Sequence, residues 1–456
     1  MRKLLFHLGW LLPAVILIWF SGGCAQIGMP TGGARDSLAP VIVRTNPPMG
    51  ATNFRGRVIT FQFDEYIELQ DLQNNFSYTP FQNQSPVVSY NLRTVTVRLR
   101  DSLKPNTTYF INLGNSVRDI NEGNIYPDLG IAFSTGDVLD TLNLRGSVSL
   151  AETGGTDSTM VAMLYRNAHD TAVRSRKPDY LSRIRGDGSF SFSYLPSGNY
   201  RVYALKDGDR DRTYNSKREM FGFLDSIIIL PGNETAVQLY AYQEESAPVP
   251  PAPGSRIFTY TTEAGKDLQD ILSPLSITFS RPLSNVNEEQ FSIKDSSGNE
   301  TEGKVFNLDS SRMKLDIEVP WREATTYTLT FSASAVQDTS GADLQKGDTI
   351  SFQTRSQNDY GTVLARFRGL DLSMNPVLQV WNGNVLVKSY PLSSPEWNSG
   401  MFIPGEYTLR ILFDRNGNGT WDTGNYEWKL QPEIVIPVQQ KITVRANFDN
   451  EVMIEL

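Results

Sequence analysis

A loop at residues 414–422, DRNGNGTWD, carries oxygen-bearing side chains at alternate positions. Its acidic and amide residues are Asp414, Asn416, Asn418 and Asp422. Calcium binds carboxylate, amide and backbone carbonyl oxygens, and alternate side chains on a tight turn can direct several of them at one point. In a twelve-residue calcium loop, Gly419 would take the turn position and Thr420 would offer its carbonyl oxygen. The pattern predicts a calcium site, although Asn425 stands where such loops carry a bidentate glutamate.

A second loop, DGDRDRTYN at residues 207–215, has a related pattern with three acids, Asp207, Asp209 and Asp211. Arg212 stands where the first loop has its turn glycine, so this backbone is less suited to surround an ion. The favoured alternative for both loops is a β-turn in which Asp, Asn and Gly bond their own backbone. In that case the loops indicate a shared fold, and a bound ion would only add rigidity.

Tryptophan is concentrated in the second half of the chain. The five tryptophans beyond the N-terminal segment are Trp321, Trp381, Trp397, Trp421 and Trp428. Exposed aromatic rings on a β-sandwich can stack on sugar rings, whereas buried rings pack the core. Trp421 and Trp428, close to the 414–422 loop, are the glycan-stacking candidates, with ordinary core packing as the favoured alternative.

Residues for catalysis are scarce. His169 is the one histidine beyond the N-terminal segment, and the chain has no HExxH motif, zinc spacing or nucleotide-binding fingerprint. Adjacent acids occur at 64–65 and 244–245, but neighbours on a strand point to opposite faces, and glycosidases need two facing carboxyls. We therefore predict a protein that is not an enzyme and has no cofactor other than the candidate calcium. A hydrolase with an unseen carboxylate pair is an alternative.

The N-terminus has the layout of a secretory signal. Two basic residues precede a mostly apolar run from Leu4 to Phe20, and small residues then lead to Cys24, the single cysteine of the chain. A thiol at this place predicts a bacterial lipoprotein in which Cys24 is acylated and becomes the new N-terminus. The alternative, an uncleaved membrane anchor, is disfavoured by polar and helix-breaking residues such as Pro13. Because there is no second cysteine, packed cores must stabilise the exported part.

Composition and net charge indicate a folded protein and exclude one class of partner. The chain has 456 residues, of which 39% are hydrophobic and 20% charged, as expected for several folded domains. Its formal charge is −8, and it becomes −10 once the first 23 residues, with two basic residues and no acids, are removed. Such a surface repels phosphate backbones, so we expect no nucleic-acid partner.

The elements that must position these loops are strands. VITFQF at 58–63 and TVTVRLR at 94–100 alternate apolar and polar residues, which predicts half-buried strands. Two tethers interrupt the strand pattern. AQIGMPTGGARDSLAP follows Cys24, and EESAPVPPAPGS at 244–255 is a Pro-rich, semi-rigid spacer that is expected to divide the chain into halves.

The two halves repeat each other. NTTYFINLGNSVRDINEGNIYPDLGIAFSTG in the first half aligns with ATTYTLTFSASAVQDTSGADLQKGDTISFQT in the second, so that Tyr109 matches Tyr327 and Asp119 matches Asp338. Further along, LPSGNYRVYALKDGDRDRTY aligns with IPGEYTLRILFDRNGNGTW. The second pair matches Gly198, Tyr200 and Asp207 with Gly405, Tyr407 and Asp414. Two patterns repeated in the same order predict an arrangement of modules A, B, A′ and B′.

Both patterns resemble known modules. The KPNTTYFINLGNSVRDINEGNIYPDLGIAFSTG stretch and its repeat resemble the last strands of bacterial Ig-like domains of the S-layer SbsA type. GDGSFSFSYLPSGNYRVYALKD resembles a transthyretin-like or carboxypeptidase-regulatory-like β-sandwich, of which the second half keeps FIPGEYTLRILFD. The whole chain, including CAQIGMPTGGARDSLAP, resembles Ig-like-domain lipoproteins of Bacteroidetes, although Ala39 stands where these usually carry a proline.

The resemblance implies an all-β fold of tandem β-sandwiches. The expected order is a signal peptide (1–23), a tether with lipidated Cys24 (24–37), Ig-like module A (38–136), transthyretin-like module B (137–243), a Pro-rich linker (244–255), Ig-like module A′ (256–355) and transthyretin-like module B′ (356–456).

Such modules are scaffolds, so they indicate the fold more firmly than the function. The expected function is a non-catalytic outer-membrane lipoprotein that acts as a structural or protein-interaction scaffold and binds envelope proteins through exposed strands. A glycan-binding surface lipoprotein is the main alternative. No acid follows Cys24 before Asp36, which favours the periplasmic face over the cell surface.

Overall fold

The computed structural model of the protein describes residues 36–232, 236–245 and 257–456. Cys24, the predicted signal peptide and most of both predicted tethers lie outside the described residues, so cleavage and lipidation stay predictions. Strands account for 47% of the structure and helices for 5%, which confirms the predicted all-β fold of tandem β-sandwiches. No helix within the described ranges is long and apolar enough to cross a membrane. The chain divides into two compact units after Leu139.

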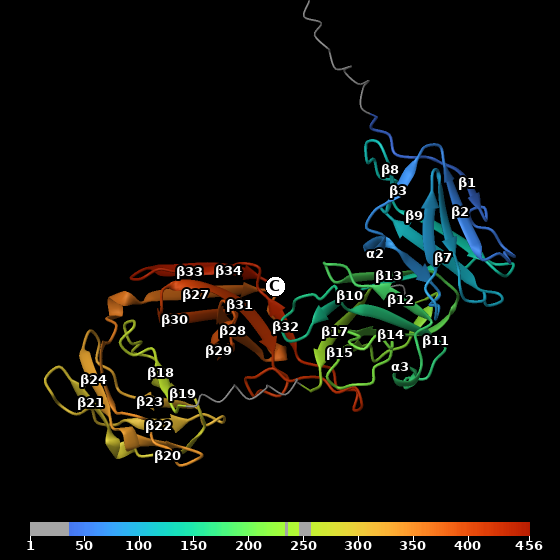
Figure 1. The fold of residues 1–456 in the computed structure, drawn as a ribbon. Coiled ribbons are helices and arrows are strands. Elements are labelled where there is room, and N and C mark those ends of the chain that lie inside the picture. Colours follow the sequence, from blue (N-terminus) through green and yellow to red (C-terminus); the bar gives the residue numbers. More distant parts are fainter. Residues whose placement is uncertain (1–35, 233–235, 246–256) are drawn as a thin grey trace, which may run out of the picture. The chain divides into compact units, whose positions relative to one another are not determined.

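The first unit contains module A, which has two sheets that share one core and a separate two-stranded ribbon (Figure 1). One sheet has the order β1 (Ile42–Asn46), β2 (Val58–Phe63), β6 (Thr94–Arg98), β5 (Val87–Asn91). The other has the order β4 (Ser77–Thr79), β7 (Thr108–Gly114), β9 (Leu129–Ser134), and the ribbon pairs β3 (Ile67–Leu69) with β8 (Val117–Asp119). A single-turn helix, α2 (Leu72–Asn75), precedes β4.

Apolar alternation decides which face of each strand enters the core. In β2 the side chains of Ile59, Phe61 and Phe63 are buried, and the residues between them are more exposed. In β6 the side chains of Val95 and Val97 face the same core. The predicted strands at 58–63 and 94–100 are confirmed, although the second ends at Arg98.

Module A′, in the second unit, repeats the strand pairing of module A. Its first sheet has the order β18 (Tyr260–Thr262), β19 (Leu275–Phe279), β23 (Lys314–Glu318), β22 (Val305–Leu308). Its second has the order β21 (Phe291–Asp295), β24 (Thr326–Phe331), β26 (Asp348–Gln353), and its ribbon pairs β20 (Leu283–Val286) with β25 (Val336–Asp338). Short 3-10 helices η1 (Glu288–Gln290) and η2 (Ala333–Ala335) flank these strands.

The residues that match between A and A′ make matching hydrogen bonds. The hydroxyl of Tyr109 accepts from the Lys104 backbone N–H at 2.8 Å. The hydroxyl of Tyr327 accepts from the backbone N–H of Arg322 at 3.1 Å. Because both tyrosines lie five residues beyond the N–H that they fix, the repeated Tyr holds the turn before the central strand.

The repeated acids also serve the fold. The carboxylate of Asp119 accepts backbone N–H bonds from Glu122, Gly123 and Asn124 at 2.6–2.9 Å. Burial opposes its charge, but these bonds outweigh the burial and lower the pKa of Asp119.

In A′ the repeat of Asp119 is Asp338, which is buried. Its carboxylate accepts from the Ser340 hydroxyl at 2.6 Å and from Arg281 Nη1 at 2.8 Å. These bonds hold the pKa of Asp338 far below its usual range. Both repeated acids are thus charged groups that stabilise a turn.

Modules B and B′ share a second pattern of pairing. In B the order is β12 (Tyr180–Arg183), β11 (Val161–Arg166), β14 (Gly198–Leu205), β15 (Met220–Phe223), β17 (Val237–Gln243), β10 (Leu142–Leu150), β13 (Ser189–Leu195), with β16 (Ile228–Leu230) beside β14. In B′ one sheet is β30 (Glu396–Phe402), β27 (Gly361–Arg368), β34 (Asp449–Glu455), and the other is β29 (Val385–Pro391), β28 (Pro376–Asn382), β31 (Gly405–Phe413), β32 (Ile434–Pro437), with β33 (Ile442–Val444) beside β31.

Each B-type module has one parallel pair among its antiparallel strands, β10 with β17 and β27 with β34. The tyrosine of the repeated turn has the same role in both. The hydroxyl of Tyr200 donates to the carbonyl of Pro196 at 2.6 Å, and that of Tyr407 donates to the carbonyl of Ile403 at 2.9 Å. The short helices of this part are α3 (Ala172–Ser175), η3 (Gln357–Asp359) and η4 (Leu372–Met374).

Modules B and B′ pack against each other within the second unit. Alternate residues of β11 face two cores: Ala162 and Leu164 face the interior of B, whereas Met163 and Tyr165 face a core that also contains Tyr426 of B′. Val435 of B′ donates its N–H to the carbonyl of Ala151 in B at 2.8 Å. Aromatic packing thus joins B, which precedes the Pro-rich linker in the sequence, to B′, which follows it.

Candidate functional site

The 414–422 loop connects β31 to β32 in module B′. The buried carboxylate of Asp414 accepts the backbone N–H groups of Gly417 and Gly419 at 2.7 and 2.6 Å. Both glycines have positive φ, +74° and +80°, which a residue with a Cβ adopts only at a cost. Asp414 therefore organises the turn, and the glycines allow the loop to wrap around its carboxylate.

The other predicted ligands are joined to one another. The carboxylate of Asp422 accepts from the side-chain amides of Asn416 and Asn418 at 2.6 and 2.7 Å. The amide oxygen of Asn418 accepts from the N–H and hydroxyl of Thr420 at 2.8 and 2.9 Å. The structure brings these residues together in a closed hydrogen-bond network, and calcium binding by them stays a prediction.

Glu433, just before β32, completes this loop and was not among the predicted residues. Its buried carboxylate accepts the N–H groups of Arg415 and Asp422 at 2.7 and 3.0 Å. Its backbone carbonyl accepts from the Trp421 indole N–H at 2.8 Å. A signal was present in the sequence, where Gln-Pro-Glu precedes an apolar strand, but nothing there linked Glu433 to a loop 11 residues earlier.

In module B, the equivalent loop between β14 and β15 brings together Asp207, Asp209 and Glu219. Asp211, the third acid predicted from the sequence, instead accepts from the N–H and hydroxyl of Thr213 at 2.6 and 2.7 Å. Burial, with the nearby charge of Asp209, raises the pKa of Glu219. The sequence could not reveal Glu219 as a member, because it lies 12 residues beyond Asp207.

The two glycan-stacking candidates have different environments. Trp421 is partly buried against two cores, one of them shared by B and B′, and its indole N–H is bonded to Glu433. Trp428 is 79% exposed. Trp428 therefore offers a free ring face, whereas the ring of Trp421 is packed against the protein.

The contact between B and B′ is centred on Tyr426, which is buried among aromatic rings. Its ring contacts those of Phe221 and Phe223 at centroid distances of 5.0 and 5.1 Å. Its hydroxyl lies 2.9 Å from Asp170 Oδ1, which also accepts from the hydroxyl of Tyr203 at 2.9 Å. Burial raises the pKa of Tyr426, so the hydroxyl stays neutral.

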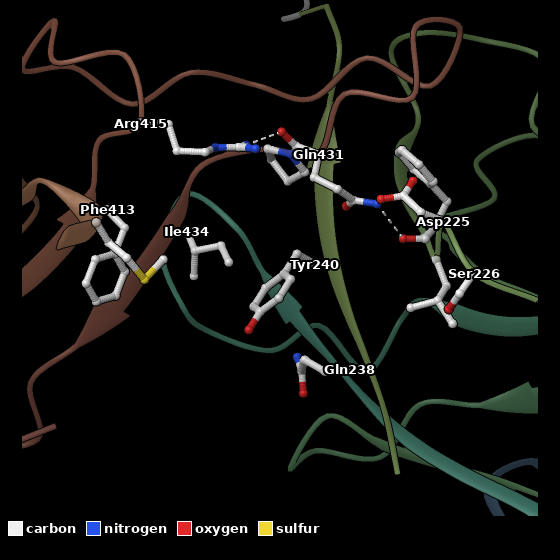
Figure 2. A pocket seen from close by; sticks show the side chains of 12 residues that line it. Asp225, Ser226, Gln238, Tyr240, Phe413, Arg415, Gln431 and Ile434 are labelled. Atoms are coloured by element: carbon white, nitrogen blue, oxygen red, sulfur yellow. Dashed lines mark hydrogen bonds between the residues drawn. The ribbon is translucent and has the colours of Figure 1, made fainter. Parts of the chain in front are cut away.

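A pocket of about 460 Å³ opens beside this contact, with both modules in its wall. Figure 2 shows Tyr240 of B and Ile434 of B′ on its apolar side. Gln431 donates from its side chain to the Phe223 carbonyl at 3.2 Å, and its own carbonyl accepts from Arg415 (Figure 2). The Gln431–Phe223 bond crosses from B′ to B, and the wall that faces the pocket is mainly apolar.

The histidine and one of the paired acids considered for catalysis have local hydrogen-bond partners. His169 is exposed, and its Nδ1 lies 3.1 Å from the Thr171 hydroxyl. Glu244 is turned inward, where its carboxylate accepts from the hydroxyl of Tyr214 at 2.9 Å and the N–H of Tyr426 at 3.0 Å. His169 thus bonds within its own turn, and Glu244 takes part in the contact between B and B′.

Comparison with known proteins identifies two of the modules. Residues 36–135 and 253–354 match the family model described as bacterial Ig-like domain. These segments cover modules A and A′, so the chain carries two bacterial Ig-like domains. No curated protein matches the chain.

Solved structures with some likeness include an S-layer protein and a pilin subunit. The Bacillus anthracis TIE protein is 11% identical with a TM-score of 0.17, covering 94% of this chain and 75% of its own. BcpA, the major pilin subunit of Bacillus cereus, is 11% identical with a TM-score of 0.16, covering 68% and 99%. The N-terminal part of the bacterial S-layer protein SbsC is 13% identical with a TM-score of 0.19, covering 37% and 42%. At these TM-scores the likenesses carry no functional argument.

Proposed function

We propose that this chain, which carries two bacterial Ig-like domains, is a non-catalytic scaffold of the cell envelope that is anchored to the outer membrane by lipid on Cys24. The observation that carries the proposal is that the repeated residues form hydrogen bonds that stabilise turns. Tyr109 and Tyr327 fix turns, Asp119 and Asp338 fix turns, and the 414–422 loop is closed on itself. These turn-fixing roles of the repeated residues support a scaffold function.

A free strand edge in B′ is the surface that we propose for a partner. β29 is the last strand of its sheet and pairs with β28 alone among the described strands. Its residues Val385, Leu386 and Val387 are 67%, 42% and 47% exposed. An unpaired edge offers backbone N–H and C=O groups to an extended segment, and apolar side chains add contact area.

Lys388 on the same strand would discourage pairing if its charge projected along the edge. Its ammonium instead lies over the ring of Tyr390, 5.5 Å from the centroid. The partner that fits this edge is an extended strand of another envelope protein, bound through main-chain hydrogen bonds.

The anchor is tested by growth with radiolabelled palmitate. The wild-type chain should be labelled and remain with the membrane fraction, whereas Cys24→Ser should be unlabelled and released by washing. The lipid anchor would be contradicted if the wild-type chain stayed unlabelled, or if mass spectrometry showed that it keeps its leader.

The scaffold function is tested by affinity purification after crosslinking in intact cells. The wild-type chain should capture an envelope protein, and Val387→Lys should lose it, because a charge on the edge blocks strand pairing. Arg98→Lys, a change of an exposed residue on β6 of the first unit, is the control that should retain the partner. Equal capture by Val387→Lys would show that β29 is not the surface.

A glycan-binding lipoprotein is a second candidate, and the exposure of Trp428 is what favours it. Binding on a glycan array that is lost in Trp428→Ala and retained in a Trp421→Phe control would support it. Absence of binding by the wild-type chain would remove it.

A further inference from the structure

Three carboxylates converge on the loop between β14 and β15 of module B. Asp207, Asp209 and Glu219 each offer an oxygen, and these oxygens lie within 4.8 Å of one another. Calcium–oxygen distances are about 2.3–2.6 Å, so oxygens on opposite sides of one Ca²⁺ ion are separated by about this span. The three side chains therefore already have the spacing of ligands around a single ion.

The second observation is a buried oxygen that has no partner. The Asp207 side chain is only 1% exposed. Its Oδ2 accepts from the N–H and Nη1 of Arg212 at 3.2 and 2.8 Å, whereas its Oδ1 is buried without a hydrogen-bond partner among the described residues. A carboxylate oxygen removed from water needs a donor or a cation, and leaving it bare is costly. The free oxygen therefore belongs to one of the three grouped carboxylates.

The other two carboxylates are only lightly held. Asp209 Oδ2 accepts from the Asn215 side chain at 3.0 Å, and its Oδ1 accepts from the Asp211 N–H at 3.1 Å. Glu219 Oε2 accepts from the N–H groups of Asn215 and Ser216 at 3.3 and 3.4 Å, which are long bonds. Arg212 pairs with Asp207 and balances one of the three charges. An all-oxygen group with net negative charge suits a hard cation such as Ca²⁺.

We propose that Asp207, Asp209 and Glu219 bind one Ca²⁺ ion, which fixes the loop that carries Tyr214. The ring of Tyr214 stacks on Phe221 with centroids 4.0 Å apart and meets the ring of Tyr426 at 5.9 Å. The ion therefore stabilises one wall of the contact between B and B′. This inference does not rest on the proposed scaffold function.

The equivalent loop of B′ provides an internal control. There both carboxylate oxygens of Asp414 accept hydrogen bonds from backbone N–H groups. The carboxylate of Asp422 accepts hydrogen bonds from two asparagine side chains. The group of three carboxylates found in B has no counterpart at the 414–422 loop among the described residues. Calcium binding at the B loop should thus be independent of the B′ loop.

The test is calorimetric titration of the full chain with CaCl₂, with MgCl₂ as the comparison ion. The wild-type chain should bind one Ca²⁺ with a Kd on the order of 10⁻⁴–10⁻³ M, as is common for extracellular modules, and Mg²⁺ more weakly. Asp209→Asn combined with Glu219→Gln should weaken binding at least tenfold, whereas Asp422→Asn should leave it unchanged. The buried Asp207 is left intact so that the variants keep their fold, which circular dichroism checks.

Thermal unfolding gives the second readout. Calcium at 10 mM should raise the melting temperature of the wild-type chain and of Asp422→Asn, and EDTA should reverse the rise. The double variant should show no rise. The proposal is overturned if the wild-type chain binds no calcium, if the double variant binds it equally well, or if Asp422→Asn is the variant that loses it.

Discussion

Replacing Tyr426 by alanine should uncouple module B from module B′. The buried ring of Tyr426 projects from B′ into the aromatic core of B. Its four ring partners are Tyr203, Tyr214, Phe221 and Phe223, at centroid distances of 5.0–6.0 Å. No other single side chain among the described residues is placed to make this set of contacts from B′, so its removal leaves a cavity between the modules.

The size of the effect follows from what each substitution removes. Deleting a large buried aromatic side chain costs about 3–5 kcal/mol of unfolding free energy. Tyr426→Phe removes only the hydroxyl, and Asp170 keeps the Tyr203 hydroxyl at 2.9 Å and its ion pairs with Arg201 and Lys429. The loss for Tyr426→Phe should therefore be about 1 kcal/mol. Trp428→Ala, at a 79% exposed site two residues away, should change stability by less than about 0.5 kcal/mol.

Urea denaturation followed by tryptophan fluorescence measures these differences. All five tryptophans beyond the N-terminal segment belong to the second unit, so the signal reports on the unit that contains both B and B′. The expected order of midpoints is Trp428→Ala equal to wild type, then Tyr426→Phe, then Tyr426→Ala. A Tyr426→Ala midpoint equal to that of Trp428→Ala would refute the shared core.

Two further predictions concern charge and backbone. The lowered pKa of Asp338 means that its stabilisation is present above the unfolded-state pKa of about 4 and is lost as pH falls below that value. The free energy of unfolding, measured at decreasing pH, should therefore fall less steeply in Asp338→Asn than in the wild-type chain. Parallel curves would contradict this role of Asp338. Gly417→Ala, at φ +74°, should lower the free energy of unfolding by about 1 kcal/mol. Gly208→Ala should leave it nearly unchanged, because the φ there is not positive and a methyl group meets no neighbour. Equal losses in the two glycine variants would show that backbone strain is not what the 414–422 loop avoids.

Local patterns in the sequence predicted much of the fold. The alternation in β2 and β6 is enough to define strands and their buried faces, because both have one face on a core. The repeat was visible because Tyr109 and Asp119, with their partners Tyr327 and Asp338, fix turns through side-chain bonds that other residue types would not make. Residues that hold a turn are therefore the ones that repeated domains retain.

Local sequence patterns could not predict contacts between residues that lie far apart in the chain. Glu219 reaches the acids of its loop, and Glu433 closes the 414–422 loop, only because neighbouring strands return to the same place. The packing of Tyr426 against module B spans more than 200 residues, and no local pattern in the sequence indicated it. Chain pattern identifies elements, whereas the pairing of modules depends on which apolar faces remain uncovered.

The most direct test of the scaffold function is site-specific photo-crosslinking in intact cells. A photoreactive residue at Leu386 on β29 should form one dominant adduct with another envelope protein, and the adduct should diminish in a Cys24→Ser background. The same residue at exposed Trp428, in the loop between β31 and β32 of the same module, should form no such adduct. Absence of an adduct at Leu386, or the same adducts at both positions, would contradict the account.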